Sequence, residues 1–115
     1  MRPSGSDRVT HYSQHVGTRE GKHYKATLFE GAQMMVGLNC LEPGQTQPYH
    51  DHADADKVYV VMEGRGSFVV DDEPCEAGPG DVVWAPAGIG HGVENRGTER
   101  LVLLVGIAPP PGAHP

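Results

Sequence analysis

The chain has 115 residues and a net charge of −6, with 37% hydrophobic and 21% charged residues. This length fits one domain with one modest core. An acidic chain without a basic stripe is a poor partner for nucleic acid or anionic lipid, because both kinds of binding draw on lysine and arginine. The composition therefore favours a globular domain that binds neither nucleic acid nor membranes.

The cysteines and the first residues bear on the compartment. Cys40 and Cys75 have no CxxC spacing, so we expect both to be free thiols in a reducing compartment. Residues 1–7 lack the apolar segment of a signal peptide, and no run approaches the roughly 18 apolar residues of a membrane span. We therefore expect a cytoplasmic protein.

Taken in chain order, the sequence predicts three regions. Residues 1–21 are polar without a clear period, which predicts a partly ordered N-terminal arm, and residues 109–115 form a Pro-rich tail. Between them, residues 22–108 hold short apolar runs separated by turns. The expected strands are 25–29, 34–41, 57–63, 67–70, 81–85, 92–94 and 101–107. No window shows a helical period, so the expected fold class is all-β, a small jelly-roll barrel with little or no helix.

Three histidines stand out as candidate metal ligands. His50 and His52 are two residues apart, so on a strand both would lie on one face, with Cα atoms about 6.5–7 Å apart. His91 is distant in sequence, and a closed barrel would bring it to the same point. Imidazole nitrogens bind divalent ions such as Zn²⁺ at about 2.0–2.1 Å. The alternative is that an HxH pair arises by chance among seven histidines and has no site role.

The spacing around these histidines resembles the two motifs of the cupin superfamily. Gly44, His50, His52 and Gly64 fit the first motif, G-x5-H-x-H-x(3,4)-E-x6-G. The second motif, G-x5-P-x-G-x2-H-x3-N, is matched at Gly80, Pro86, Gly88, His91 and Asn95. Nine of ten fixed positions agree, over 52 of the 115 residues. The resemblance implies a small cupin barrel in which His50, His52 and His91 hold a divalent metal ion.

The sequence departs from the first motif at Lys57, where the family usually has a glutamate ligand. A charged ammonium about 5 Å from a dication would cost on the order of 6–7 kcal/mol at an effective dielectric near 20. That exceeds the contribution of any single hydrogen bond it could make. A protonated Lys57 pointing at a bound metal ion is therefore unfavourable.

Four arrangements remain open at this position. The three histidines could form the metal centre alone, with Lys57 turned away or paired with an acid. A bulge could bring Asp54 or Asp56 in as the fourth ligand. The site could instead be free of metal, with the histidines and Lys57 binding an anion. Finally, Lys57 could act as a base or form a Schiff base.

Two classes of function follow from a three-histidine site. The first is a metalloenzyme acting on a small organic acid or carbonyl compound, with dioxygenase chemistry on Fe or isomerase or cyclase chemistry on Mn, Ni or Zn. The second is a non-catalytic barrel that binds or senses a small molecule or anion. Candidate catalytic groups are Lys57, Tyr59 and Glu63, which share one face if 57–63 is a regular strand. The resemblance also implies a homodimer, with which exposed apolar strands are compatible.

Overall fold

The computed structural model describes residues 6–51 and 54–111 and shows a protein built almost entirely of β-strands. Two short 3-10 helices, η1 (Ser6–Arg8) and η2 (Tyr12–Gln14), lie in the N-terminal arm. The nine strands are β1 (Tyr24–Glu30), β2 (Met35–Leu41), β3 (Thr46–His50), β4 (Asp56–Glu63), β5 (Gly66–Val70), β6 (Glu73–Ala77), β7 (Val82–Ala85), β8 (His91–Glu94) and β9 (Leu101–Ala108). The prediction of an all-β fold is confirmed.

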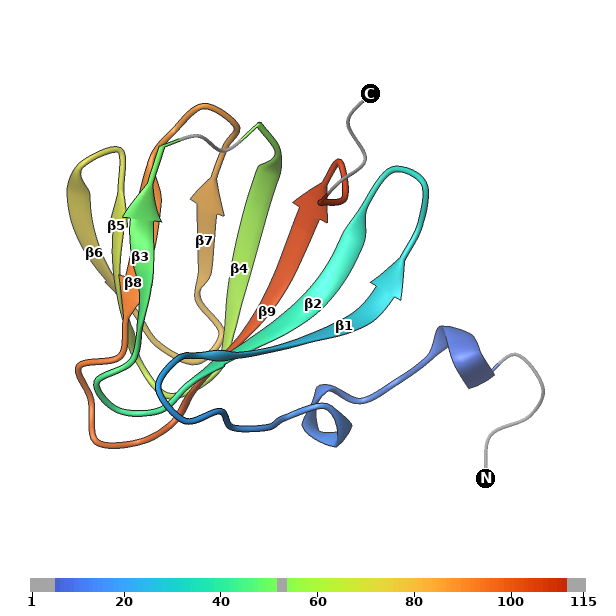
Figure 1. The fold of residues 1–115 in the computed structure, drawn as a ribbon, viewed down its shortest axis with the longest axis horizontal. Coiled ribbons are helices and arrows are strands. Elements are labelled where there is room, and N and C mark those ends of the chain that lie inside the picture. Colours follow the sequence, from blue (N-terminus) through green and yellow to red (C-terminus); the bar gives the residue numbers. More distant parts are fainter. Residues whose placement is uncertain (1–5, 52–53, 112–115) are drawn as a thin grey trace.

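The strands form two antiparallel sheets that face each other (Figure 1). The larger sheet has the order β1-β2-β9-β4-β7, and the smaller has the order β3-β8-β5-β6. The chain crosses between the sheets several times, for example from β3 to β4 and from β7 to β8, as in a jelly roll. The C-terminal ends of β3 and β7 lie at the same end of the barrel (Figure 1).

The main core fills the space between the two sheets, because alternate residues of each strand point inward. Tyr59 and Val61 of β4 meet Phe68 of β5, and all three side chains are buried. The rings of Tyr59 and Phe68 have centroids 5.5 Å apart, a favourable separation for aromatic pairs. Leu101, Leu103 and Val105 of β9 complete this core from the larger sheet.

A second apolar cluster lies on the outer face of the larger sheet. Leu38, Cys40 and Val102 are buried there, and Tyr12 and Val16 of the N-terminal arm pack against them. The arm is therefore held on the sheet by apolar contacts.

Both cysteines are free thiols, with Cys40 buried in this cluster and the second, Cys75, exposed on β6. Val82 and Trp84, on the edge strand β7, are exposed.

Two turns show how the sequence sets the strand connections. Asp71 and Asp72 have φ angles of 52° and 63° and form the tight turn between β5 and β6. Two consecutive positive φ angles match the hairpin turn whose twist suits the flanking strands. Gly64, with φ of 80°, lies where an added Cβ would be 2.3 Å from the carbonyl oxygen of Arg100. Only glycine fits that position without displacing backbone.

No helix in the described part of the chain is long and apolar enough to cross a membrane.

Candidate functional site

A cavity of about 360 Å³ opens between the sheets, on the concave face of β1 and β2. Its apolar wall comes from Met35, Val105 and Ile107. Its polar lining side chains are Lys25, Thr27, Asn39, Gln47, His50, Asp54 and Lys57. A volume at the lower end of the range for ligand cavities, with a few polar groups in an apolar wall, fits a small molecule.

The structure places His50 and His91 directly opposite each other in neighbouring strands of the smaller sheet. They are partners in the β3–β8 ladder, so both side chains point to the same face. Their ring centroids are 4.5 Å apart, at an interplanar angle of 61°. A backbone ladder therefore fixes the spacing of two histidines that are 41 positions apart in sequence.

Hydrogen bonds set which nitrogen of each ring carries the proton. Nδ1 of His50 lies 3.2 Å from the Pro48 carbonyl, and Nδ1 of His91 lies 3.3 Å from the Ile89 carbonyl. Because a carbonyl only accepts, Nδ1 is the donor in each ring. In a neutral ring Nε2 then keeps its lone pair, and that nitrogen is the one available to bind a metal ion.

Burial keeps His91 in this neutral form. The side chain is 2% exposed, and its Nε2 has no hydrogen-bond partner among the described residues. Burial lowers the pKa of His91, and the charges of Lys57 and His50 lower it further, while the hydrogen bond to Ile89 opposes the shift. An unpaired buried nitrogen is costly, so a ligand at this position would satisfy it.

The third predicted ligand, His52, lies outside the described residues. Within residues 6–51 and 54–111, no group of three or more His, Cys, Asp or Glu side chains could hold a metal ion. The described pair, His50 and His91, nevertheless fits such an ion in chemistry, since it offers two neighbouring imidazoles whose Nδ1 atoms are already hydrogen-bonded.

Lys57 is half-buried on β4 and lines the cavity from the larger sheet. Burial lowers the pKa of its amine, and the charge of Lys25 lowers it further. The charge of Lys57 also contributes to the lowered pKa of His91. The residue at the usual glutamate position is therefore turned toward the cavity and not away from it.

The two candidate carboxylates take different positions. Oδ1 of Asp56 accepts a hydrogen bond from the backbone N–H of Ala87 at 2.9 Å, which ties the start of β4 to the turn after β7. Asp56 does not line the cavity described above, and its role as a fourth ligand stays a prediction. Asp54 lies at the cavity wall.

The two remaining catalytic candidates lie on different faces of β4. Tyr59 is 1% exposed and its ring centroid is 6.0 Å from that of His91. Burial holds the pKa of Tyr59 well above its usual range, so the phenol stays protonated at neutral pH.

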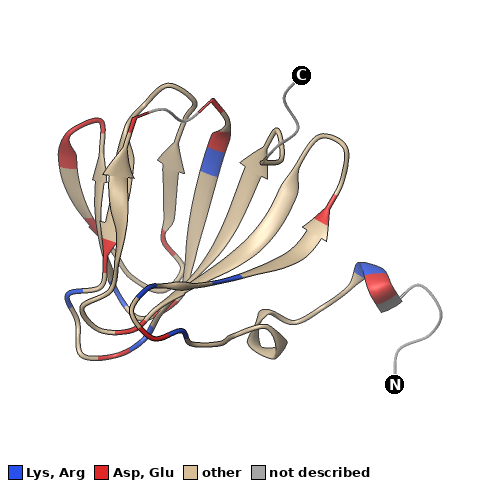
Figure 2. Cartoon of the chain, viewed as in Figure 1, with Lys and Arg blue, Asp and Glu red and all other residues tan. Residues whose placement is uncertain are grey.

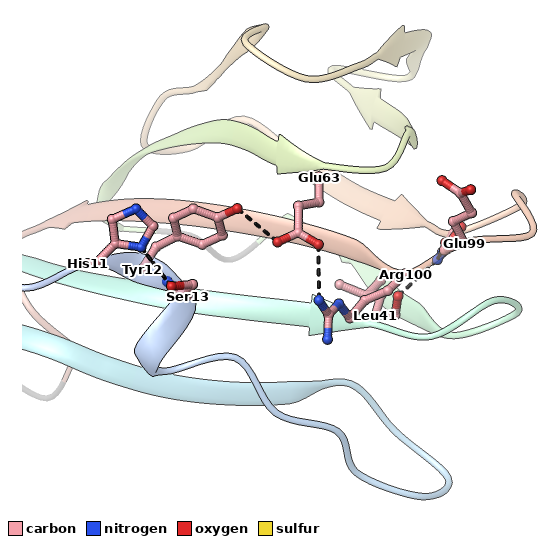
Figure 3. Close-up of polar contacts among 8 residues, drawn as sticks. His11, Tyr12, Ser13, Leu41, Glu63, Glu99 and Arg100 are labelled. Carbon is pink, nitrogen blue, oxygen red and sulfur yellow. Dashed lines mark hydrogen bonds and ion pairs between the residues drawn. The ribbon is translucent and has the colours of Figure 1, made fainter.

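Glu63 lies on the outer face, away from the cavity, so the expectation that 57–63 is a regular strand is wrong at this residue. A register shift between Val61 and Glu63 turns the strand. The Glu63 carboxylate accepts hydrogen bonds from the Tyr12 hydroxyl at 2.8 Å and from Arg100 at 3.0 Å (Figure 3). Arg100, followed by Tyr12, lowers the pKa of Glu63. This carboxylate anchors the N-terminal arm.

Four polar cavity residues were not singled out from the sequence, namely Lys25, Thr27, Asn39 and Gln47. Nδ2 of Asn39 donates to Oε1 of Gln47 at 3.4 Å, joining the two sheets beside the cavity. Both side chains are 7% exposed. Asn39 could have been noticed in the sequence, because a polar residue there interrupts an apolar run, whereas no local sequence pattern distinguishes Gln47 or Lys25. Only the order and packing of the strands in the two sheets bring these residues to one cavity.

Comparison with known proteins settles the family. Residues 37–107 match the family model described as Cupin domain. The chain is a cupin. The match covers both histidines of the pair and most of the cavity wall, while Lys25 lies before it.

Three curated relatives match this cupin over much of its length. A Streptomyces coelicolor protein, named Uncharacterized protein SCO3923, is 39% identical over 67% of this chain and 71% of its own. The Oxalate-binding protein of Thermotoga maritima is 31% identical over 78% of this chain and 69% of its own. Gentisate 1,2-dioxygenase from Ralstonia sp. is 34% identical over 64% of this chain, but the match spans only 21% of that enzyme.

Among solved structures, the protein TT1209 from Thermus thermophilus is 35% identical, with a TM-score of 0.85 over 90% of this chain and 98% of that chain.

Proposed function

We propose that this cupin holds a divalent metal ion on His50, His52 and His91 and binds a small organic acid, as its anion, at that ion. The observation that carries the proposal is the His50–His91 pair, with both Nδ1 atoms bonded to backbone carbonyls and Nε2 of His91 buried without a described partner. Cupins often bind metal ions, which agrees with this nitrogen chemistry. Fe, Mn, Ni and Zn all accept imidazole ligands.

The charges around the cavity favour an anionic ligand. Lys25 and Lys57 both line it, and three neutral histidine ligands would leave the full charge of a dication in place. Two of the curated relatives have names that refer to small organic acids, oxalate and gentisate. The apolar side chains of Val105 and Ile107 would cover the carbon skeleton of such an acid.

The same arrangement would serve a metalloenzyme of the dioxygenase or isomerase type. A bound ion would polarise a carboxylate or carbonyl oxygen of the acid. Lys57 lines the cavity, and burial, followed by the charge of Lys25, lowers the pKa of its amine, which favours it among the described cavity residues as a group that could exchange a proton with the ligand. The buried phenol of Tyr59, whose ring is near that of His91, would remain protonated.

Elemental analysis by mass spectrometry tests the proposal on untagged protein that has never met a nickel column. We expect near-stoichiometric metal in the wild type, and its loss in His50→Ala and in His91→Ala. His11→Ala is the matched control, because His11 lies exposed in the N-terminal arm. Circular dichroism of each variant establishes that it is folded.

Two results would refute the metal centre. One is a wild type that binds none of Fe, Mn, Ni or Zn after reconstitution. The other is a folded His50→Ala variant that keeps as much metal as His11→Ala.

A further inference from the structure

A second hollow, apart from the cavity between the sheets, is lined mainly by basic residues. It has a volume of about 260 Å³, and we call it the basic hollow; its lining residues are Arg19, Lys22, His23, Tyr24 and Lys25. They come from the connection between η2 and β1 and from the start of β1. Figure 2 shows basic segments along this connection and on β1. Lys25 also lines the cavity between the sheets, whereas the other four residues do not.

The basic hollow concentrates positive charge in an acidic chain. Residues 19–25 include three basic residues and one acidic residue, whereas the whole chain has a net charge of −6. Arg19, Lys22 and Lys25 are exposed, and none of them forms an ion pair with another described residue. Cations without a counter-ion repel one another, so all three would attract an anion that enters the hollow.

His23 provides an independent sign that a polar ligand belongs here. Its side chain is only 7% exposed, and neither ring nitrogen has a hydrogen-bond partner in the part of the chain that the structure describes. Buried polar groups are usually paired, so an imidazole left in this state is costly. A neutral imidazole still has one N–H to donate, and an anion oxygen in the hollow that His23 lines would accept it.

The bend that carries the first of these cations is held in place by Gln45. Nε2 of Gln45 donates to the carbonyl of Arg19 at 2.8 Å, and Oε1 of the same side chain accepts from the N–H of Glu42 at 2.9 Å. Gly21, with φ of 83°, allows the chain to turn between Arg19 and Lys22. A bend fixed before the ligand arrives loses less conformational freedom on binding than a free arm would.

The donor set favours a phosphate group over a carboxylate. A phosphate monoester carries close to two negative charges at neutral pH, which suits several cations around one hollow. Arginine can donate to two phosphate oxygens at once, and lysine adds a compact point charge. A water molecule takes about 30 Å³ in the liquid, so the hollow has room for more than one small ion. The phosphate group would therefore be part of a small organic molecule.

We propose that the basic hollow binds the phosphate group of a small phosphate monoester, with Arg19 and Lys22 at the phosphate oxygens and His23 as a hydrogen-bond donor. Lys25 adds its charge at the edge that the hollow shares with the cavity between the sheets. The inference depends neither on the proposed metal ion nor on the ligand of that cavity.

Two-dimensional NMR of the ¹⁵N-labelled full chain tests the proposal, with inorganic phosphate as the probe at pH 7.5. Sodium chloride keeps the ionic strength constant, because exposed charges are screened by salt. We expect saturable shifts of the backbone amides of residues 19–25. The dissociation constant for phosphate should be clearly lower than the one for acetate, measured in the same way.

Three substitutions remove the proposed contacts one at a time. Arg19→Met and Lys22→Met remove exposed charges, and His23→Phe keeps an aromatic ring without the N–H. Each should weaken phosphate binding by about threefold or more. Circular dichroism establishes that each variant is folded, and the two exposed positions keep the test decisive if His23→Phe does not fold.

Two further substitutions serve as matched controls. Arg8→Met removes the same charge from an exposed residue of η1 that does not line the hollow. Lys57→Met removes a lysine that lines only the cavity between the sheets. Both should keep the wild-type affinity for phosphate.

Four results would count against the site. If residues 19–25 show no saturable shifts, or if acetate binds as tightly as phosphate, the proposal is overturned. If Arg8→Met weakens binding as much as Arg19→Met, the attraction is diffuse and no site exists. If Lys57→Met weakens binding as much as Lys22→Met, the phosphate lies between the sheets instead. A folded His23→Phe variant with wild-type affinity would remove His23 from the site.

Discussion

Replacing Asn95 with alanine should destabilise the barrel by about 3 kcal/mol, through the loss of the three hydrogen bonds made by its buried side chain. The side chain is 0% exposed. Its Nδ2 donates to the carbonyls of Leu41 at 2.8 Å and Glu99 at 2.9 Å, and its Oδ1 accepts from the N–H of Gly97 at 2.9 Å. Each bond contributes about 1 kcal/mol net, and alanine would leave all three backbone groups without this partner.

The measurement is equilibrium unfolding in urea, with thermal unfolding as a second readout. A loss of about 3 kcal/mol in a domain of this size corresponds to a fall in Tm of roughly 12 °C. Asn39→Ala is a matched control, because Asn39 is also buried but donates only one long hydrogen bond, to Gln47 at 3.4 Å. The reasoning would be refuted if Asn95→Ala cost less than about 1 kcal/mol, or no more than Asn39→Ala.

Two further stability predictions follow from the backbone and from a buried histidine. Gly64→Ala should cost roughly 3 kcal/mol or more, because its Cβ would meet the Arg100 carbonyl at 2.3 Å as well as forcing a positive φ on alanine. Gly80→Ala, which has a φ of 89° and nothing within 4 Å of the added Cβ, should cost only about 1–2 kcal/mol, and equal losses in urea unfolding would contradict the steric explanation. His23 is 7% exposed with neither ring nitrogen hydrogen-bonded to a described residue, and burial, followed by Lys25, Lys22 and Arg19, lowers its pKa. As the pH falls, His23 is protonated in the unfolded chain at a higher pH than in the folded protein. The free energy of unfolding should therefore be constant above a pH of about 6.5 and should decrease as the pH drops from there through the lower pKa of the folded state. His23→Leu should show a smaller loss of unfolding free energy between pH 7.5 and 5.5 than the wild type, and an identical loss would show that His23 is not the source.

The sequence predicts most of the strands because their residues are β-branched or apolar and their turns are rich in Gly, Pro and Asp. The two strands without a predicted run of their own, β3 and β6, are the edges of the smaller sheet. Each contains a proline, Pro48 or Pro74, and few apolar residues. An edge strand tolerates proline and needs little burial, so it leaves a weak pattern in the sequence.

The part of the candidate site that lies within the two sequence motifs could be predicted from the spacing of their residues. The two motifs place His50 and His91 together, and the structure shows them as ladder partners. The orientation of Glu63 is not predictable, because one register shift after Val61 moves it to the other face. Lys25 enters the cavity only through the order of strands in the larger sheet, which no local pattern reports.

The division of the cavity between two sheets has a consequence for how such a protein can change. The β3–β8 ladder fixes His50 and His91 independently of the facing wall, where the side chains of β1 and β2 have room to vary. Substitutions at Lys25, Thr27 or Met35 could therefore exchange one acceptable acid for another while the histidine pair keeps its geometry. If the proposed function holds, metal binding and ligand choice would depend on different sheets, so the ligand could be changed by substitutions on the larger sheet alone.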